Sequence, residues 1–237
     1  MEQFTEKTVV YASFFERVPA GFEISPDSSP AWEPLRQLVP LLHRLPDNSG
    51  GRLNVLPEVC IRGDGPLSVA DDVEIWPGVT LVRPVWIGRN SKLLPGAFVR
   101  SSWIGEGCVV GHCVEVARSI LMGQVAIPHQ SIILDSILGF NVNVAGGARF
   151  ANLPLSFFKG ETKGQGIRIR LPSGDKLDTG LTKLGAILGD DVVTPVNLTV
   201  NPGTLVGRRA IIYPRNGVSL DGVWAQEAKI KPKQILK

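Results

Sequence analysis

Three consecutive segments of 17 residues decide the fold: residues 87–103 read IGRNSKLLPGAFVRSSW, residues 104–120 read IGEGCVVGHCVEVARSI and residues 121–137 read LMGQVAIPHQSIILDSI. Written under one another and continued to residue 152, these segments align large apolar residues in three columns. The columns are Ile87, Ile104, Leu121 and Leu138, then Leu93, Val110, Ile127 and Val144, then Val99, Val116, Ile133 and Phe150. A fixed period near 18 that divides into steps of about six predicts hexapeptide repeats coiled into an all-β parallel β-helix.

Three further series of residues follow the column residues by four positions. They are Ser91, Cys108, Val125 and Val142, then Ala97, Val114, Ser131 and Ala148, then Trp103, Ile120 and Ile137. Because side chains alternate along a strand, a residue two positions before a column residue points to the same side, so we expect all three series inside the coil. Gly88, Gly105 and Gly139 follow column residues directly and are expected at corners that need a positive φ angle.

The sequence on either side of the repeat predicts four parts. Residues 1–54 lack the repeat and contain an expected helix over residues 31–44, with Pro30 at its first position, that would cap the open end of the β-helix. The β-helix is expected over residues 55–220, with an extruded loop over residues 151–183. Inside the loop, Ile167, Ile169 and Leu171 alternate with arginines and predict a short strand or hairpin. Residues 221–237 are expected to form a C-terminal tail.

After the loop, the repeat is expected to resume in pairs of residues 18 positions apart. These pairs are Leu188 with Val206, Thr194 with Ile212, and Val200 with Val218.

Composition excludes several classes of function. The formal net charge is only +3, and lysines of the C-terminal tail supply that excess, so no basic stripe for nucleic acid is expected. No apolar run is long enough to cross a membrane, and no signal peptide is recognised at the start. Three cysteines do not suggest a disulfide framework. We therefore expect a cytoplasmic protein with neither nucleic-acid nor membrane partners.

The period stacks two of the three histidines. His112 and His129 lie 17 residues apart, two positions after the column residues Val110 and Ile127. Since neighbouring turns of a β-helix lie about 4.8 Å apart, both histidines are expected at one corner, one above the other. They are interpreted as solvated turn residues, as a general base for an amine or hydroxyl nucleophile, or as ligands of a metal shared with another subunit. In the γ-class carbonic anhydrases, a hexapeptide-repeat family that binds zinc with three histidines between subunits, two of the ligands lie a few residues apart on one turn. This chain lacks such a pair, so no metal is expected.

Several short runs carry a family resemblance. They are Gly111-His112-Cys113-Val114-Glu115-Val116, Pro128-His129, Asn141-Val142-Asn143-Val144, Ala151-Asn152-Leu153 and Lys183-Leu184-Gly185-Ala186-Ile187-Leu188-Gly189-Asp190. In their order and spacing, residues 104–218 resemble the acetyltransferase domain of the bifunctional N-acetylglucosamine-1-phosphate uridylyltransferase/glucosamine-1-phosphate acetyltransferases. They resemble still more the related sugar-1-phosphate nucleotidylyltransferases. The resemblance implies a left-handed β-helix, a homotrimer, and sites between subunits for acetyl-CoA as co-substrate.

The same resemblance implies roles for individual residues. His129 matches the catalytic base, and Glu115 and Asn152 match residues that contact the amino-sugar acceptor. Lys183 matches a lysine that contacts the acceptor, with His112 as a neighbour on the substrate side. The stretches that contact CoA are expected at Gly146, Gly147, Val196 and Pro214.

Departures from the family leave the exact function open. Where the family holds the acceptor phosphate with basic residues, this chain has Leu94 and Ala117. Where the family has a tyrosine near the catalytic base, this chain has Ile132. No nucleotidyltransferase domain is recognised. We therefore expect a CoA-dependent acyltransferase acting on a sugar phosphate or nucleotide sugar, without uridylyl transfer and with an acceptor other than glucosamine-1-phosphate. The alternative is a non-catalytic trimer that binds a nucleotide sugar or a partner protein; a metal lyase or hydratase is a third interpretation.

Overall fold

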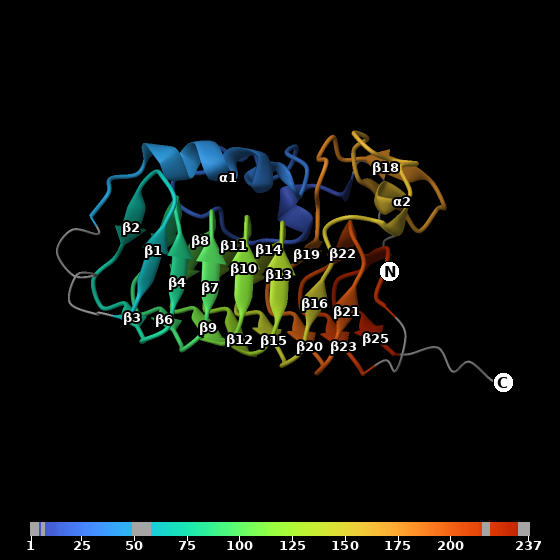
Figure 1. Ribbon diagram of the computed structural model, residues 1–237. Helices are drawn as coiled ribbons and strands as arrows, with labels where there is room; N and C mark the ends of the chain where they lie inside the picture. The colour runs from blue at the N-terminus through green and yellow to red at the C-terminus, as the bar shows by residue number, and fades with distance from the viewer. Residues whose placement is uncertain (1–4, 6–7, 49–57, 215–218, 232–237) are drawn as a thin grey trace.

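A three-sided β-helix makes up most of the computed structural model, which describes residues 5, 8–48, 58–214 and 219–231 (Figure 1). The chain passes from a first sheet to a second and a third, and then returns to the first sheet one turn further along. Neighbouring turns pair in parallel in each of the three sheets. The coil is the left-handed parallel β-helix that the family resemblance implies.

Each sheet collects one strand from nearly every turn. The first sheet contains β1 (Cys60–Arg62), β4 (Thr80–Val82), β7 (Phe98–Arg100), β10 (Glu115–Ala117), β13 (Ile132–Leu134), β16 (Arg149–Phe150) and β21 (Thr199–Val200). The second contains β2 (Leu67–Val69), β5 (Val85–Ile87), β8 (Trp103–Glu106), β11 (Ile120–Gly123), β14 (Ile137–Phe140), β19 (Ala186–Leu188), β22 (Thr204–Val206) and β24 (Val223–Trp224). The third contains β3 (Glu74–Ile75), β6 (Lys92–Leu93), β9 (Val109–His112), β12 (Ala126–His129), β15 (Asn143–Val144), β20 (Val193–Thr194), β23 (Ile211–Ile212) and β25 (Lys229–Ile230).

The predicted columns form the interior of the β-helix. Leu121 pairs with Ile104 on one side and Leu138 on the other, each 17 residues away. Val116 pairs in the same way with Val99 and Ile133. All twelve column residues belong to one buried cluster, so the period alone was sufficient to find the core.

The structure corrects the predicted position of one of the three series that were expected inside the coil. The series that begin at Ser91 and Ala97 are buried as predicted, whereas Trp103, Ile120 and Ile137 belong to a second cluster outside the coil. The third step of the repeat is five residues long rather than six, so Trp103 directly precedes Ile104 and points outward.

Serines occupy the inward positions that this series was expected to fill: Ser102, Ser119 and Ser136. The Ser119 hydroxyl donates to the Ala117 carbonyl over 2.9 Å and accepts the Ser136 N–H over 3.1 Å. This ladder satisfies backbone groups at a corner that is closed to water.

Glycines after column residues have a different role from the one expected. Gly88, Gly105 and Gly139 do not have positive φ angles; positions such as Asn90, Gln124 and Asn141 do. A Cβ atom on Gly105 would lie 2.1 Å from the Met122 carbonyl oxygen of the next turn. Glycine is therefore required there because two turns approach closely, and not because of its left-handed conformation.

The N-terminal segment covers the outer face of the second sheet and does not cap the end of the β-helix as expected (Figure 1). It contains a 3-10 turn, η2 (Tyr11–Ser13), and helix α1 (Glu33–Arg44), which starts two residues later than predicted with Pro34 in its first turn. Its apolar side chains pack on outward-facing ones of the second sheet, among them Trp103, Ile120, Met122, Ile137, Ile187 and Leu205. An apolar outer face of that length needs a cover along the coil.

Asp190 ties this cover to the coil. Its buried carboxylate accepts the backbone N–H groups of Glu16 and Phe140, each over 2.8 Å, and its own N–H donates to the Phe14 carbonyl. Burial raises the pKa of this carboxyl group above its ordinary value.

The extruded loop and the C-terminal turns differ in part from expectation. The loop holds α2 (Leu155–Phe158) and an antiparallel hairpin, β17 (Arg168–Arg170) with β18 (Lys176–Asp178), as the alternating pattern predicts. Leu188 pairs with Val206 as expected, but Val200 bridges to Leu220. The expected partner Val218 and the expected start of the repeat at Val55 lie outside the described residues.

The expected tail from residue 221 is wrong up to Ile230, because β24 and β25 continue the second and third sheets. No helix in the described ranges is long and apolar enough to cross a membrane.

The serine ladder predicts a measurable cost for the change Ser119→Ala. The Ser136 N–H would lose its acceptor at a fully buried corner, so the free energy of unfolding should fall by about 1–3 kcal/mol in urea titrations. Ser173→Ala at the exposed turn of the hairpin is the matched control and should change it by less than about 0.5 kcal/mol. Equal stability of the two variants would contradict the role given to the ladder.

Candidate functional site

The predicted catalytic and CoA-contacting residues share one edge of the β-helix, where the chain turns from the third sheet into the first. We call it the histidine edge; from turn to turn it contains Pro95, His112, His129, Gly146, Gly147, Val196 and Pro214. His112 and His129 are direct partners in the pairing of β9 with β12, which confirms the predicted stack. Backbone hydrogen bonds continue the edge, from the Gly147 N–H to the His129 carbonyl and from the Asn197 N–H to the Gly146 carbonyl.

Local contacts occupy both ring nitrogens of His112. Its Nδ1 lies 2.9 Å from the Pro95 carbonyl oxygen, which can only accept, so Nδ1 carries a proton. Its Nε2 lies 3.4 Å from the Cys113 thiol and accepts from it in the neutral tautomer. His112 is therefore oriented by its neighbours and is poorly placed to take a further proton.

His129 is in the opposite situation. Its side chain is exposed, and no described residue forms a hydrogen bond with its ring. The next turn places Gly146 beside it, where a Cβ atom would lie 3.2 Å from the His129 Cβ. A glycine there leaves space next to the imidazole, so of the two stacked histidines only His129 is free to accept a proton.

The other predicted acceptor contacts do not all reach this edge. Glu115 starts β10 near the histidine edge and lies half-buried between Phe98 and Ile132 on the neighbouring strands. Asn152 lies at the far end of the first sheet, five residues beyond Gly147, a span of about 16 Å at the rise of a strand. The exposed Lys183 lies beside Asn152, because the Leu184 N–H donates to the Asn152 carbonyl over 3.2 Å.

Asn152 is part of an ion-paired ladder with the same period of 17 residues. The Arg118 guanidinium donates two hydrogen bonds to Asp135, of 2.7 and 2.6 Å, and the Asn152 amide donates to the same carboxylate. The hydrogen bonds to Asp135 raise the pKa of Arg118. Asp135 was not predicted as a site residue, although the spacing of 118, 135 and 152 would have indicated it.

One chain thus separates the predicted residues into two groups on opposite edges of the first sheet. His112, His129, Gly146, Gly147, Val196 and Pro214 lie on the histidine edge with Glu115 near it, while Asn152 and Lys183 lie on the other edge. Among the residues described, no three His, Cys, Asp or Glu side chains gather as metal ligands would.

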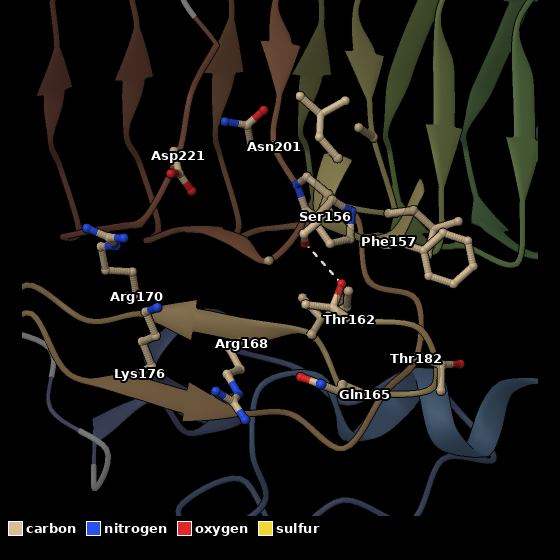
Figure 2. A pocket seen from close by; sticks show the side chains of 18 residues that line it. Ser156, Phe157, Thr162, Gln165, Arg168, Arg170, Lys176, Thr182, Asn201 and Asp221 are labelled. Carbon is tan, nitrogen blue, oxygen red and sulfur yellow. Dashed lines mark hydrogen bonds between the residues drawn. The ribbon is translucent and has the colours of Figure 1, made fainter. Parts of the chain in front are cut away.

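A cavity of about 610 Å³ lies between the extruded loop and the last turns of the coil (Figure 2). It contains none of the predicted site residues, but Ala151, Leu153 and Thr182 in its wall flank Asn152 and Lys183. Arg168, Arg170 and Lys176 of the hairpin also line it. The sequence held a signal for this cavity, namely arginines alternating with apolar residues in an unusually long loop.

The parallel coil and its histidine edge define a hexapeptide-repeat protein of the left-handed β-helix class. The chain belongs to the GMPPB C-terminal domain family, which residues 81–221 match.

Among its relatives, the bifunctional sugar-1-phosphate nucleotidylyltransferase/acetyltransferase of Sulfurisphaera tokodaii is 34% identical over 178 residues, which cover 75% of this chain and 42% of the relative. The bifunctional protein GlmU of Synechococcus elongatus is 31% identical over 162 residues, or 65% of this chain and 34% of the relative. The chain therefore spans less than half the length of these relatives. The alignment with the solved structure of the polysialic acid O-acetyltransferase OatWY covers 76% of this chain and 86% of the OatWY chain, at 14% identity and a TM-score of 0.44.

The ion-paired ladder predicts that Asp135→Asn destabilises the protein. Asp135 is almost fully buried, and its carboxylate accepts hydrogen bonds from both Arg118 and Asn152. An amide at this position would place its own N–H donors against these N–H donors. The free energy of unfolding should fall by about 1–3 kcal/mol.

The control for this ladder is Glu74→Gln, which breaks the exposed Lys92–Glu74 pair and should leave the urea midpoint unchanged. A loss of stability no greater for Asp135→Asn than for Glu74→Gln would show that the ladder contributes nothing.

Proposed function

We propose that this protein is a CoA-dependent acetyltransferase that modifies an amine or hydroxyl group of a sugar phosphate or nucleotide sugar. The observation that carries the proposal is the exposed His129 imidazole, stacked on a histidine whose own nitrogens are occupied. The bifunctional relative from Sulfurisphaera tokodaii, whose name includes both an acetyltransferase and a sugar-1-phosphate nucleotidylyltransferase, supports the reaction type and the acceptor class.

In the proposed reaction, His129 removes a proton from the acceptor as its amine or hydroxyl attacks the thioester carbonyl of acetyl-CoA. The tetrahedral intermediate then needs a hydrogen-bond donor at its oxyanion. The Gly147 N–H already donates to the His129 carbonyl, so the Gly146 N–H is the better placed of the two glycine donors. Collapse of the intermediate releases CoA as a thiol and leaves the acetyl group on the acceptor.

We propose further that the working form is a homotrimer in which two copies complete each site. The N-terminal segment covers the second sheet, whereas the third sheet presents the exposed side chains of Val193 and Ile211, and the exposed Trp76 directly follows its strand β3. Exposed apolar residues on a flat sheet favour contact with another copy. Such contact would bring the Asn152 and Lys183 of one copy toward the histidine edge of another.

A non-catalytic binding protein of the same fold remains the second candidate. The observation that favours it is the apolar character of Leu94 and of the buried Ala117, where the family carries basic residues. The two candidates differ in whether acetyl-CoA binds and whether His129 matters for turnover.

Acetyl-CoA should stabilise the protein against heat. A ligand at 100 times its Kd adds about 2.7 kcal/mol to the free energy of unfolding, which a thermal-shift measurement resolves. Val196→Glu places a negative charge on the histidine edge near the expected CoA phosphates and should reduce the shift. Ser173→Glu on the hairpin turn is the charge-matched control and should preserve it. A wild-type protein that shows no shift at any acetyl-CoA concentration would favour the binding-protein alternative.

His129→Ala should lower kcat by about 10²–10⁴ while the size of the assembly stays the same, because a general base contributes roughly that factor. The matched variant is His112→Ala on the adjacent turn, which should raise KM more than it lowers kcat, since His112 is oriented by Pro95 and Cys113. Steady-state kinetics with acetyl-CoA separates the two. Unchanged turnover in His129→Ala would rule out the assignment of the base.

A further inference from the structure

One wall of the cavity beside the extruded loop is a hairpin with an apolar face and a basic face. Ile169 of β17 is fully buried against the cluster that covers the second sheet, and Ile167 and Leu171 beside it are nearly so. Because side chains alternate along a strand, Arg168 and Arg170 point the other way and line the cavity, with Lys176 of β18. The apolar face fixes the hairpin, so the basic face is held in place and is not a loose surface tract.

The charges on that face are unbalanced. Arg170 and Lys176 lie directly opposite each other in the hairpin register, an arrangement of like charges that destabilises a strand pair. Within the described residues neither side chain takes part in an ion pair, and Arg168 has only a long contact of 3.9 Å with Asp178. Across the cavity, Asp221 is the single carboxylate in the wall. Three cations against one carboxylate leave the cavity positively charged, which favours an anionic ligand.

The rest of the wall suits a ring that carries hydroxyl groups. Leu153, Pro154 and Phe157 supply apolar contact. Gln165 and Asn201 supply amides (Figure 2). The Ser156 and Thr162 hydroxyls, both in the wall, lie 3.0 Å apart. About 610 Å³ falls within the range of small-molecule sites, large enough for a sugar phosphate or a nucleotide.

We propose that this cavity is a binding site for a phosphate ester of a sugar or a nucleoside, separate from the histidine edge. The phosphate group lies between Arg170 and Lys176 and relieves the repulsion between them. The ring lies toward Phe157, and its hydroxyl groups meet the amides of Gln165 and Asn201, which line the cavity. The site requires no acetyl transfer, so it stands or falls independently of the proposed reaction.

Isothermal titration of the full chain without acetyl-CoA tests the proposal with four probes: a hexose 1-phosphate, a nucleoside diphosphate, inorganic phosphate and the uncharged hexose. We expect saturable binding of at least one ester, tighter than that of inorganic phosphate and weakened by salt. The uncharged hexose should not bind. Tighter binding of the hexose 1-phosphate identifies a sugar phosphate as the natural class, and tighter binding of the diphosphate identifies a nucleotide.

The double change Arg170→Gln with Lys176→Gln should weaken binding of the ester at least about tenfold, a loss of about 1.4 kcal/mol. Lys159→Gln with Lys163→Gln removes the same charge from exposed positions of the same loop outside the cavity, and should leave affinity unchanged. Thermal midpoints of both double variants establish that each is folded. The proposal is overturned if neither ester saturates, if inorganic phosphate binds as tightly as the esters, or if both double variants lose affinity equally.

Discussion

Parallel pairing between successive turns is the constraint on which the rest of this structure depends. It makes every residue a neighbour of the residues about one turn before and after it, so each choice of side chain is repeated along the coil. The apolar columns fill the interior in this way, and at a closed corner each serine hydroxyl accepts the backbone N–H of the residue one turn later. The same rule stacks His112 on His129 and joins Arg118, Asp135 and Asn152. Core, ladder and candidate site are thus consequences of one register.

A second consequence concerns the outer faces. Three sheets of a single coil enclose only one core, so apolar residues that point outward need a separate cover. The N-terminal segment supplies it for the second sheet. Asp190 links that cover to the coil, because its carboxylate accepts the Glu16 N–H and its own N–H donates to the Phe14 carbonyl. The described N-terminal segment does not cover the first and third sheets, and the proposed sharing of the site between subunits is built on that division.

The sequence predicted the features that depend on the period of the repeat. Its predictions were wrong where the length of a repeat step changes, and where segments distant in sequence pack together. Columns, the histidine stack and the hairpin followed from spacing alone. Trp103 was placed on the wrong side because one step of the repeat has five residues. The position of α1 along the coil, and not at its end, depends on how much apolar surface the second sheet exposes, which no local pattern reports. The cavity joins residues of the loop to Asn201 and Asp221, so the sequence could indicate the loop but not the residues that complete the wall.

The central functional claim is that one chain carries two incomplete halves of a site, with His129 on one edge of the first sheet and Asn152 on the other. Mixed assemblies of His129→Ala and Asn152→Ala chains test it most directly, with transfer of the acetyl group to the acceptor followed by mass spectrometry. In a ring of like subunits, random mixing of equal amounts leaves about a quarter of the sites with both residues intact. We predict recovery of acetyl transfer to about that fraction from two variants that are inactive alone. Co-assembled variants that stay inactive would contradict the account.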